Sequence, residues 1–151
     1  MIYLIDGSEH AMNPSHYQSA TIDSVVEYCK TKEVLGVDTE TEGFDFTCKK
    51  MIMFQIGDKD NQYVIDTRHV SIEPLRNILE DKSIIKIFHN AKFDYKFIKK
   101  WGNIECEGIY DTFLTERVLN CGKDNVRYGL KDVCKKYLNV ELNKEVRNQF
   151  I

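Results

Sequence analysis

The sequence predicts an α/β fold in which a mixed β-sheet is flanked by helices. Three segments of strand length come first, at 33–40, 51–58 and 62–67, and GDKDN joins the last two as a hairpin turn. Helical and strand-like segments then alternate along the chain. This order is typical of an antiparallel meander followed by parallel strands, and 151 residues are enough for one such domain.

In the first half of the chain, residues 1–20 show no regular pattern and are expected to be irregular, with 1–16 as an extension of the domain. A helix is expected over 21–30, because its apolar residues share one helical face and Thr21 or Ser24 can act as the N-cap. After the three strands, a second helix is expected over 70–82.

In the second half, a strand over 83–89 leads directly into a helix over 90–101, with Asn90 as its cap. A short strand is expected at 104–109, and helices are expected at 111–120 and 128–138. Asp66 and Asp111, each followed by a threonine, are most simply a strand-end residue and a helix cap. The later strands should be parallel, because helices connect them by right-handed crossovers.

The composition excludes several classes of protein. Hydrophobic residues make up 42% and charged residues 30% of the chain, as in soluble globular proteins, and no stretch approaches the length of a membrane helix. The five cysteines form no CxxC pair, which favours reduced thiols in the cytoplasm (of a host cell, for a phage or virus protein) over disulfides or zinc. A net charge of −3 does not itself predict nucleic-acid binding, although bound metal ions can supply positive charge.

Acidic residues gather where the first predicted strand ends, in the sequence GVDTETEG. Side chains alternate along a strand, so Asp38 and Glu40 share one face, about 6.6 Å apart. Leu35 and Val37 point to the other face. Two like charges on one face repel each other unless something positive lies between them.

The helix over 90–101 places a third acid. At about 100° per residue, Asp94 falls on the same arc as Phe97 and Ile98, whereas the lysines of this helix share the opposite arc. A carboxylate that faces a core is costly unless it is hydrogen-bonded, paired or bound to a metal. No lysine or arginine lies on its arc to pair with it.

These acids predict a metal site. The strand that carries Asp38 and Glu40 can end beside the start of the helix that carries Asp94, so that both elements direct acids inward and three carboxylates converge. Oxygen ligands suit Mg²⁺ or Mn²⁺, and two such ions about 3.5–4 Å apart support phosphodiester hydrolysis. Simpler interpretations stay open, because D-x-E can begin a solvated loop and Asp94 can favour the helix dipole.

Two motifs carry a resemblance to a known family. VDTETEG resembles the first motif, D-x-E, of the DEDD superfamily of 3′–5′ exonucleases, and HNAKFD resembles their second motif, N-x-x-[FY]-D. From about Tyr17 onward the chain is similar to the proofreading domain of family A (Pol I-like) DNA polymerases and to ribonuclease D. The resemblance implies a ribonuclease H-like fold with a five-stranded mixed sheet. It also implies hydrolysis of single-stranded nucleic acid from the 3′ end, with DNA proofreading as the first expectation.

The resemblance implies a two-metal site as well. Asp38 and Glu40 would hold the first Mg²⁺ or Mn²⁺ ion, Asp38 would bridge to the second, and Asp94 would support the second through water. The family also needs a fourth carboxylate, in a downstream Tyr-x-x-x-Asp or His-x-x-x-x-Asp motif whose Tyr or His orients the water. Tyr128 and Asp132 match by letters but come too soon after Asp94, so Asp132 is expected to be a surface helix residue and the third motif to be missing.

For the substrate, the resemblance assigns contact with the terminal nucleotide to Thr41, a wedge between terminal bases to Phe44, and positioning of the strand to Asn90. Ordinary packing against the sheet is the alternative for Phe44. Because the third motif is missing, we expect the chain to be part of a longer exonuclease or polymerase, or to be completed by a partner chain, with little or no turnover alone. A non-catalytic module that binds nucleic acid or protein is the alternative, and an exposed C-terminal face could drive dimerisation.

Overall fold

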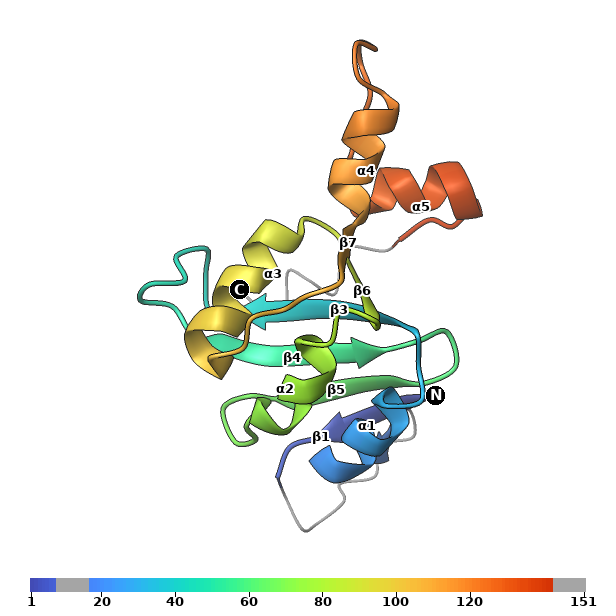
Figure 1. Ribbon diagram of the computed structural model, residues 1–151. Helices are drawn as coiled ribbons and strands as arrows, with labels where there is room; N and C mark the ends of the chain where they lie inside the picture. The colour runs from blue at the N-terminus through green and yellow to red at the C-terminus, as the bar shows by residue number, and fades with distance from the viewer. Residues whose placement is uncertain (8–16, 143–151) are drawn as a thin grey trace.

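The computed structural model describes residues 1–7 and 17–142 and contains a mixed seven-stranded sheet in the order β2-β1-β5-β4-β3-β6-β7 (Figure 1). The antiparallel meander is confirmed, and it consists of β3 (Val34–Thr41), β4 (Met51–Gly57) and β5 (Gln62–Asp66). The parallel strands that follow are β6 (Ile85–Phe88) and β7 (Ile109–Asp111). The predicted α/β class is therefore correct.

The N-terminal segment adds two strands that were not expected. β1 (Ile2–Ile5) pairs in parallel with β5, and β2 (Gln18–Ser19) pairs in parallel with β1. The expectations of an irregular segment over 1–20 and of five strands are wrong for these residues. The physical reason is that β5 leaves the meander with an unpaired edge, whose backbone groups the short IYLI segment can satisfy.

The helices begin and end close to their predicted positions, with one exception. They are α1 (Ile22–Cys29), the 3₁₀ helix η1 (Glu73–Leu75) with α2 (Arg76–Leu79), α3 (Ala91–Phe97) with the π-helix η2 (Ile98–Gly102), α4 (Thr112–Leu119) and α5 (Leu130–Leu138). The predicted helix over 70–82 is shorter and starts as a 3₁₀ turn that contains Pro74. The strand predicted at 104–109 lies instead at β7, so only Ile109 belongs to both.

One face of the sheet is buried, and the described residues leave the other face, which we call the open face, largely uncovered. Along β3, Leu35, Val37 and Thr39 are buried, whereas Val34, Gly36 and Asp38 are exposed. The buried face packs against apolar side chains of α1, α2 and α3 in a single core. No helix within residues 1–7 and 17–142 is long and apolar enough to cross a membrane.

Helices α4 and α5 form a projection beyond the β7 edge of the sheet (Figure 1). The buried carboxylate of Glu116 on α4 joins the two helices, because it accepts hydrogen bonds from Lys136 Nζ at 2.5 Å and from Tyr137 Oη at 2.7 Å. Asn120 Nδ2 donates a third hydrogen bond to the same carboxylate at 2.8 Å.

Asp111 fixes the start of two helices at once. Its carboxylate accepts hydrogen bonds from the backbone N–H groups of Asn90 at 3.0 Å and Ala91 at 2.9 Å, where α3 begins. It also accepts them from Phe113 at 2.9 Å and Leu114 at 3.3 Å, where α4 begins. The prediction that the Asn90 side chain caps α3 is wrong, because Asn90 has a left-handed backbone (φ 72°) and no side-chain cap bond. Asp111 supplies that cap from the neighbouring strand.

We predict that Asp111→Ala lowers the free energy of unfolding by about 2–4 kcal/mol, because it removes the cap of two helices and each cap is worth roughly 1–2 kcal/mol. Urea denaturation followed by circular dichroism measures this change. Asp124→Ala, on an exposed turn between α4 and α5, is the control and should change stability by less than about 0.5 kcal/mol. Equal stability of the two variants would contradict the double-cap role.

Candidate functional site

The candidate site lies where β3 loses its parallel neighbour. β6 pairs with β3 only at Val34, Leu35 and Gly36, so the same edge of β3 is open from Val37 onward. Helix α3 begins three residues after the last residue of β6 and runs beside this open edge (Figure 1). A carboxylate in the first turn of α3 can therefore reach backbone groups of β3 that have no strand partner on that side.

Asp94 makes this contact. Its Oδ1 atom accepts hydrogen bonds from the backbone N–H of Thr39 at 3.0 Å and from Thr39 Oγ1 at 2.7 Å. Both residues are buried, with 3% of Asp94 and 5% of Thr39 exposed. The carboxylate thus takes the place that a carbonyl of a longer β6 would occupy. The predicted inward direction of Asp94 is confirmed, and the hydrogen-bonding partner that its burial requires is Thr39.

The environment of Asp94 favours its neutral form. Burial raises the pKa of Asp94 to about 6, the nearby charge of Asp111 adds to the increase, and the hydrogen bonds from Thr39 act in the opposite direction. A carboxyl group in this state carries a free-energy cost when it ionises. A cation bound beside it would offset that cost.

Asp38 and Glu40 flank Thr39 on the open face of β3. The predicted alternation is confirmed, because Thr39 is buried between an exposed Asp38 and a partly exposed Glu40. The expectation that Asp38 points inward is wrong, since the inner face of β3 is already filled by apolar side chains. Asp38 and Glu40 nevertheless belong to one short segment of β3, and Asp94 is hydrogen-bonded to Thr39, the residue between them.

The donor set fits a hard divalent cation in its chemistry. All three candidate ligands are carboxylates, and no ion pair joins Glu40 or Asp94 to a lysine or arginine in the described parts of the chain. Within residues 1–7 and 17–142, no group of three or more His, Cys, Asp or Glu side chains could hold a metal ion, so the predicted convergence of the three carboxylates is not found in this structure. The assignment of metal ligands therefore stays a prediction.

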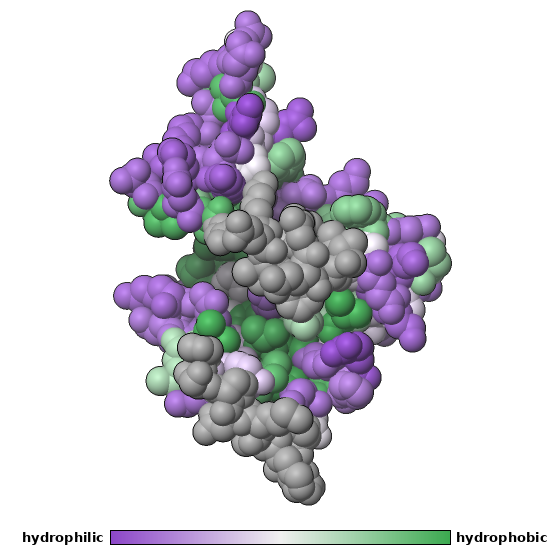
Figure 2. All heavy atoms as spheres, turned by 180° about the vertical axis from the view of Figure 1, so that it is seen from behind, coloured by the Kyte–Doolittle hydropathy of each residue, from purple (hydrophilic) through white to green (hydrophobic). Residues whose placement is uncertain are grey.

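A groove of about 650 Å³ runs across the open face of the sheet and includes Asp38, Gln55, Ile87 and His89 in its lining. Figure 2, which shows the rear of Figure 1, has hydrophobic surface in the lower half of the view, with hydrophilic surface on either side. An apolar groove with an acid on its wall is typical of a ligand-binding site.

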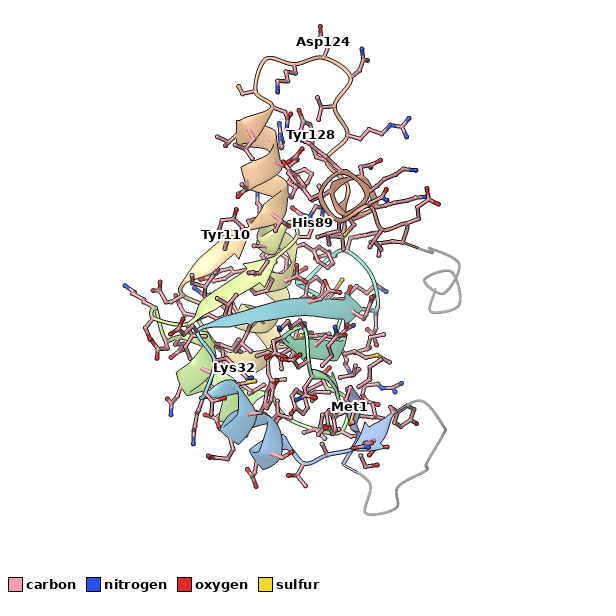
Figure 3. All side chains as sticks on the ribbon, turned by 90° about the vertical axis from the view of Figure 1, so that its right-hand side faces the viewer. Met1, Lys32, His89, Tyr110, Asp124 and Tyr128 are labelled. Carbon is pink, nitrogen blue, oxygen red and sulfur yellow. The ribbon has the colours of Figure 1, made fainter. Side chains whose placement is uncertain are left out.

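The sequence assigned no role to His89, although it directly precedes Asn90 of the second motif. Its Nδ1 lies 2.9 Å from Thr112 Oγ1, and Thr112 Oγ1 donates a hydrogen bond to the Phe88 carbonyl at 3.0 Å. Burial lowers the pKa of His89. Figure 3 shows His89 between the sheet and the segment that carries Tyr128. His89 thus joins the groove to the base of the α4–α5 projection.

The three predicted substrate contacts lie around the loop that follows β3. Thr41 Oγ1 donates a hydrogen bond to the Gly43 carbonyl at 2.7 Å and so helps to shape that loop. Phe44 is 84% exposed, and its ring meets that of Phe93 edge-on, with 6.2 Å between the ring centroids. Phe44 and Asn90 line one small pocket of about 180 Å³. The high exposure of Phe44 disfavours ordinary packing as its main role.

Comparison with known proteins identifies relatives over most of the chain. The model of a family described as 3′–5′ exonuclease matches residues 15–149. The chain is 29% identical over 124 residues to DNA polymerase I of Aquifex aeolicus, a match that covers 82% of this chain and 20% of that protein. It is 28% identical over 137 residues to human exosome complex component 10, covering 87% of this chain and 15% of that protein. The chain thus spans a fifth or less of these relatives.

The fold is likewise shared with a solved structure. The structure of NrnC from Brucella melitensis with bound Mg²⁺ has a TM-score of 0.68 and 22% identity, and the match covers 95% of this chain and 64% of that one. The predicted ribonuclease H-like fold is confirmed by this likeness, with seven strands in place of five.

We predict that metal-free wild-type protein loses stability relative to Asp94→Asn as the pH rises from about 4 to about 7. The asparagine keeps an acceptor for Thr39 but cannot ionise. Because the folded-state pKa of Asp94 is raised from 3.8 to about 6, its contribution to stability is present below the lower value and is lost as pH rises through the higher one. The difference should grow by up to about 3 kcal/mol.

Urea denaturation in EDTA at each pH measures this difference. Asp23→Asn, at an exposed position in the first turn of α1, is the control and should show a nearly constant difference from wild type. A wild-type-to-Asp94→Asn difference that does not change between pH 4 and 7 would contradict the ionisation cost assigned to Asp94.

Proposed function

The chain belongs to the 3′–5′ exonuclease family, and from this premise we propose that it hydrolyses the terminal phosphodiester bond at the 3′ end of single-stranded nucleic acid with the help of divalent metal ions. The observation that carries the proposal is the hydrogen bonding of Asp94 to Thr39, the residue between Asp38 and Glu40. It ties the acids of both family motifs to one segment of β3.

We assign the metal ions to these three carboxylates. Asp38 and Glu40 would hold the Mg²⁺ or Mn²⁺ ions, and Asp94 would support them from its place beside Thr39. Bound ions of this kind supply an activated water and stabilise the leaving oxygen. The likeness to NrnC from Brucella melitensis, which was solved with bound Mg²⁺, supports this choice of metal.

The protein supplies the geometry. Thr39 holds the Asp94 carboxylate at the edge of β3, so the acid does not have to be reoriented for each substrate. Asp111 holds the backbone at Asn90 in a left-handed conformation beside the same helix, where the Asn90 side chain would position the strand. Phe44 offers an exposed ring on which a terminal base can stack, a contact worth about 1–3 kcal/mol for any base.

The proposed substrate class is single-stranded nucleic acid, and the experiment below compares DNA with RNA. The two protein relatives, a DNA polymerase I and an exosome component, are similar to this chain to nearly the same degree. Proofreading of DNA follows from the polymerase likeness, and trimming of RNA follows from the exosome likeness. Discrimination between the two depends on how the pocket treats a 2′-hydroxyl group.

Turnover by these 151 residues alone should be weak. The family's third motif would supply a fourth carboxylate and the group that orients water, and Asp132 on α5 remains a poor match for it by position in the sequence. Completion by further sequence or by a partner chain, such as a polymerase domain, would restore these groups. A non-catalytic binding module of the same fold is the competing proposal.

We predict slow, metal-dependent shortening of a 5′-labelled single strand from its 3′ end when protein is in molar excess and Mn²⁺ is present. DNA and RNA of one sequence are compared on denaturing gels. Asp38→Ala should abolish the shortening, because it removes a proposed metal ligand, whereas Asp23→Ala on α1 should leave it unchanged.

Two results would change this conclusion. Shortening that persists in Asp38→Ala, or an absence of any Mn²⁺-dependent shortening by wild type, would contradict the exonuclease proposal and favour the binding module. Rapid multiple turnover that Asp38→Ala abolishes would support the exonuclease proposal but contradict the expected weakness of this chain.

A further inference from the structure

Helix α5 contributes to the wall of the groove but is weakly attached to the rest of the chain. None of its residues is buried, although Leu130 at its start lines the groove together with Asp38 and His89. An element with so little buried surface can detach locally while the remaining fold persists. The contacts that hold α5 therefore decide whether this side of the groove is closed.

Contacts near its two ends hold α5. Its second half is bound to α4 through the Glu116 carboxylate, to which Lys136 Nζ and Tyr137 Oη donate hydrogen bonds. These hydrogen bonds lower the pKa of Glu116, so this contact stays charged at mildly acidic pH. The start of α5 is held through Tyr128, two residues before the helix, whose backbone is hydrogen-bonded to the ring of His89.

The His89 ring can make its hydrogen bonds in either charge state (Figure 3). Since the hydrogen bond with Tyr128 favours the charged ring, the ring is the donor and the Tyr128 carbonyl is the acceptor. Ring Nδ1 lies 2.9 Å from Thr112 Oγ1, whose hydroxyl proton can serve either this nitrogen or the Phe88 carbonyl at 3.0 Å. An uncharged ring can thus donate to Tyr128 and accept from Thr112, whereas a charged ring can donate to both. Hydrogen bonding alone does not decide between the two forms.

The surroundings of the ring oppose its charge. Phe113 meets it edge-on with 5.7 Å between the ring centroids, and no ion pair joins His89 to an acid among the described residues. Burial lowers the pKa of His89 below its usual 6.5, and the opposing effects of Asp111 and of the Tyr128 hydrogen bond do not offset it. The charged groups on the elements around the ring are Asp111 on β7, Arg117 on α4, Asp38 in the groove, and Lys131 and Asp132 on α5.

We propose that His89 is a latch whose protonation releases the start of α5 from the groove. The uncharged ring holds Tyr128, and with it Leu130, beside the groove that contains Asp38. A charged ring regains hydration when Tyr128 moves away, while Glu116 keeps the second half of α5 on α4.

The direction of the pH dependence follows from linkage. The closed form binds the proton more weakly than an open form in which water reaches the ring, so closure is favoured at higher pH and is lost as the pH falls below 6.5. His89 acts here as a positioning residue for the wall of the groove. This role does not depend on nuclease activity, so it can hold or fail independently of the proposed function.

Amide hydrogen exchange of the full chain in EDTA, followed by mass spectrometry from about pH 7.5 to about pH 5, tests the latch. Rates are corrected for the intrinsic pH dependence of exchange, and peptides from β4 are the internal reference. In wild type, the protection of residues 129–138 relative to β4 should fall severalfold as the pH decreases. His89→Gln, whose amide can donate to Tyr128 but cannot take up a proton, should keep its protection at every pH. His69→Gln, at an exposed position, is the control and should behave as wild type.

Two further measurements separate His89 from other titrating groups. Asp94 acts with the opposite sign, because its cost appears as the pH rises, and repeating the series in Asp94→Asn removes its contribution. In wild type, the loss of protection should follow the protonation of the His89 ring, measured from its ¹⁵N chemical shifts by NMR. The proposal would be overturned by constant protection of residues 129–138 in wild type, by an equal loss in His89→Gln, or by a loss that does not follow the titration of His89.

Discussion

Two hydrogen bonds from Thr39 to Asp94 join the two halves of the candidate site. They exist because β6 stops pairing with β3 at Gly36 and leaves the next backbone N–H groups on that edge without a strand partner. A buried N–H group without an acceptor is costly, and so is a buried carboxylate without a donor. Each satisfies the other here, so the fold places a hydrogen-bond acceptor beside the segment that carries Asp38 and Glu40, and Asp94 is that acceptor.

The surroundings of this contact restrict its geometry further. Asp111 binds the N–H groups that begin α3, and so sets the direction of the helix that carries Asp94. The loop after β3 returns Phe44 to the same helix, where it meets Phe93. The strand, the helix and the loop therefore meet at one corner of the sheet. That corner carries the hydrogen-bonded pair Asp94 and Thr39 together with the exposed ring of Phe44.

The sequence predicted the parts of this site that follow from local periodicity, and it missed those that depend on contacts between distant residues. Alternation along β3 and the helical arc of Asp94 needed only neighbouring residues. The strand at Ile2–Ile5 depends on the open edge of β5, some 60 residues away in the chain, and has no local signal beyond four apolar residues. The capping of α3 by Asp111 is equally non-local. The inward direction expected for Asp38 is wrong, because the sequence does not show which face of β3 the helices cover.

The most direct test of this account is a crystal structure of the chain soaked with Mn²⁺, with the metal located by its anomalous scattering. The account predicts manganese peaks bound to the carboxylates of Asp38 and Glu40, with Asp94 still hydrogen-bonded to Thr39 and close enough to contact the metal's water ligands. Manganese that binds only elsewhere, or an Asp94 carboxylate turned away from β3 when metal is bound, would contradict it.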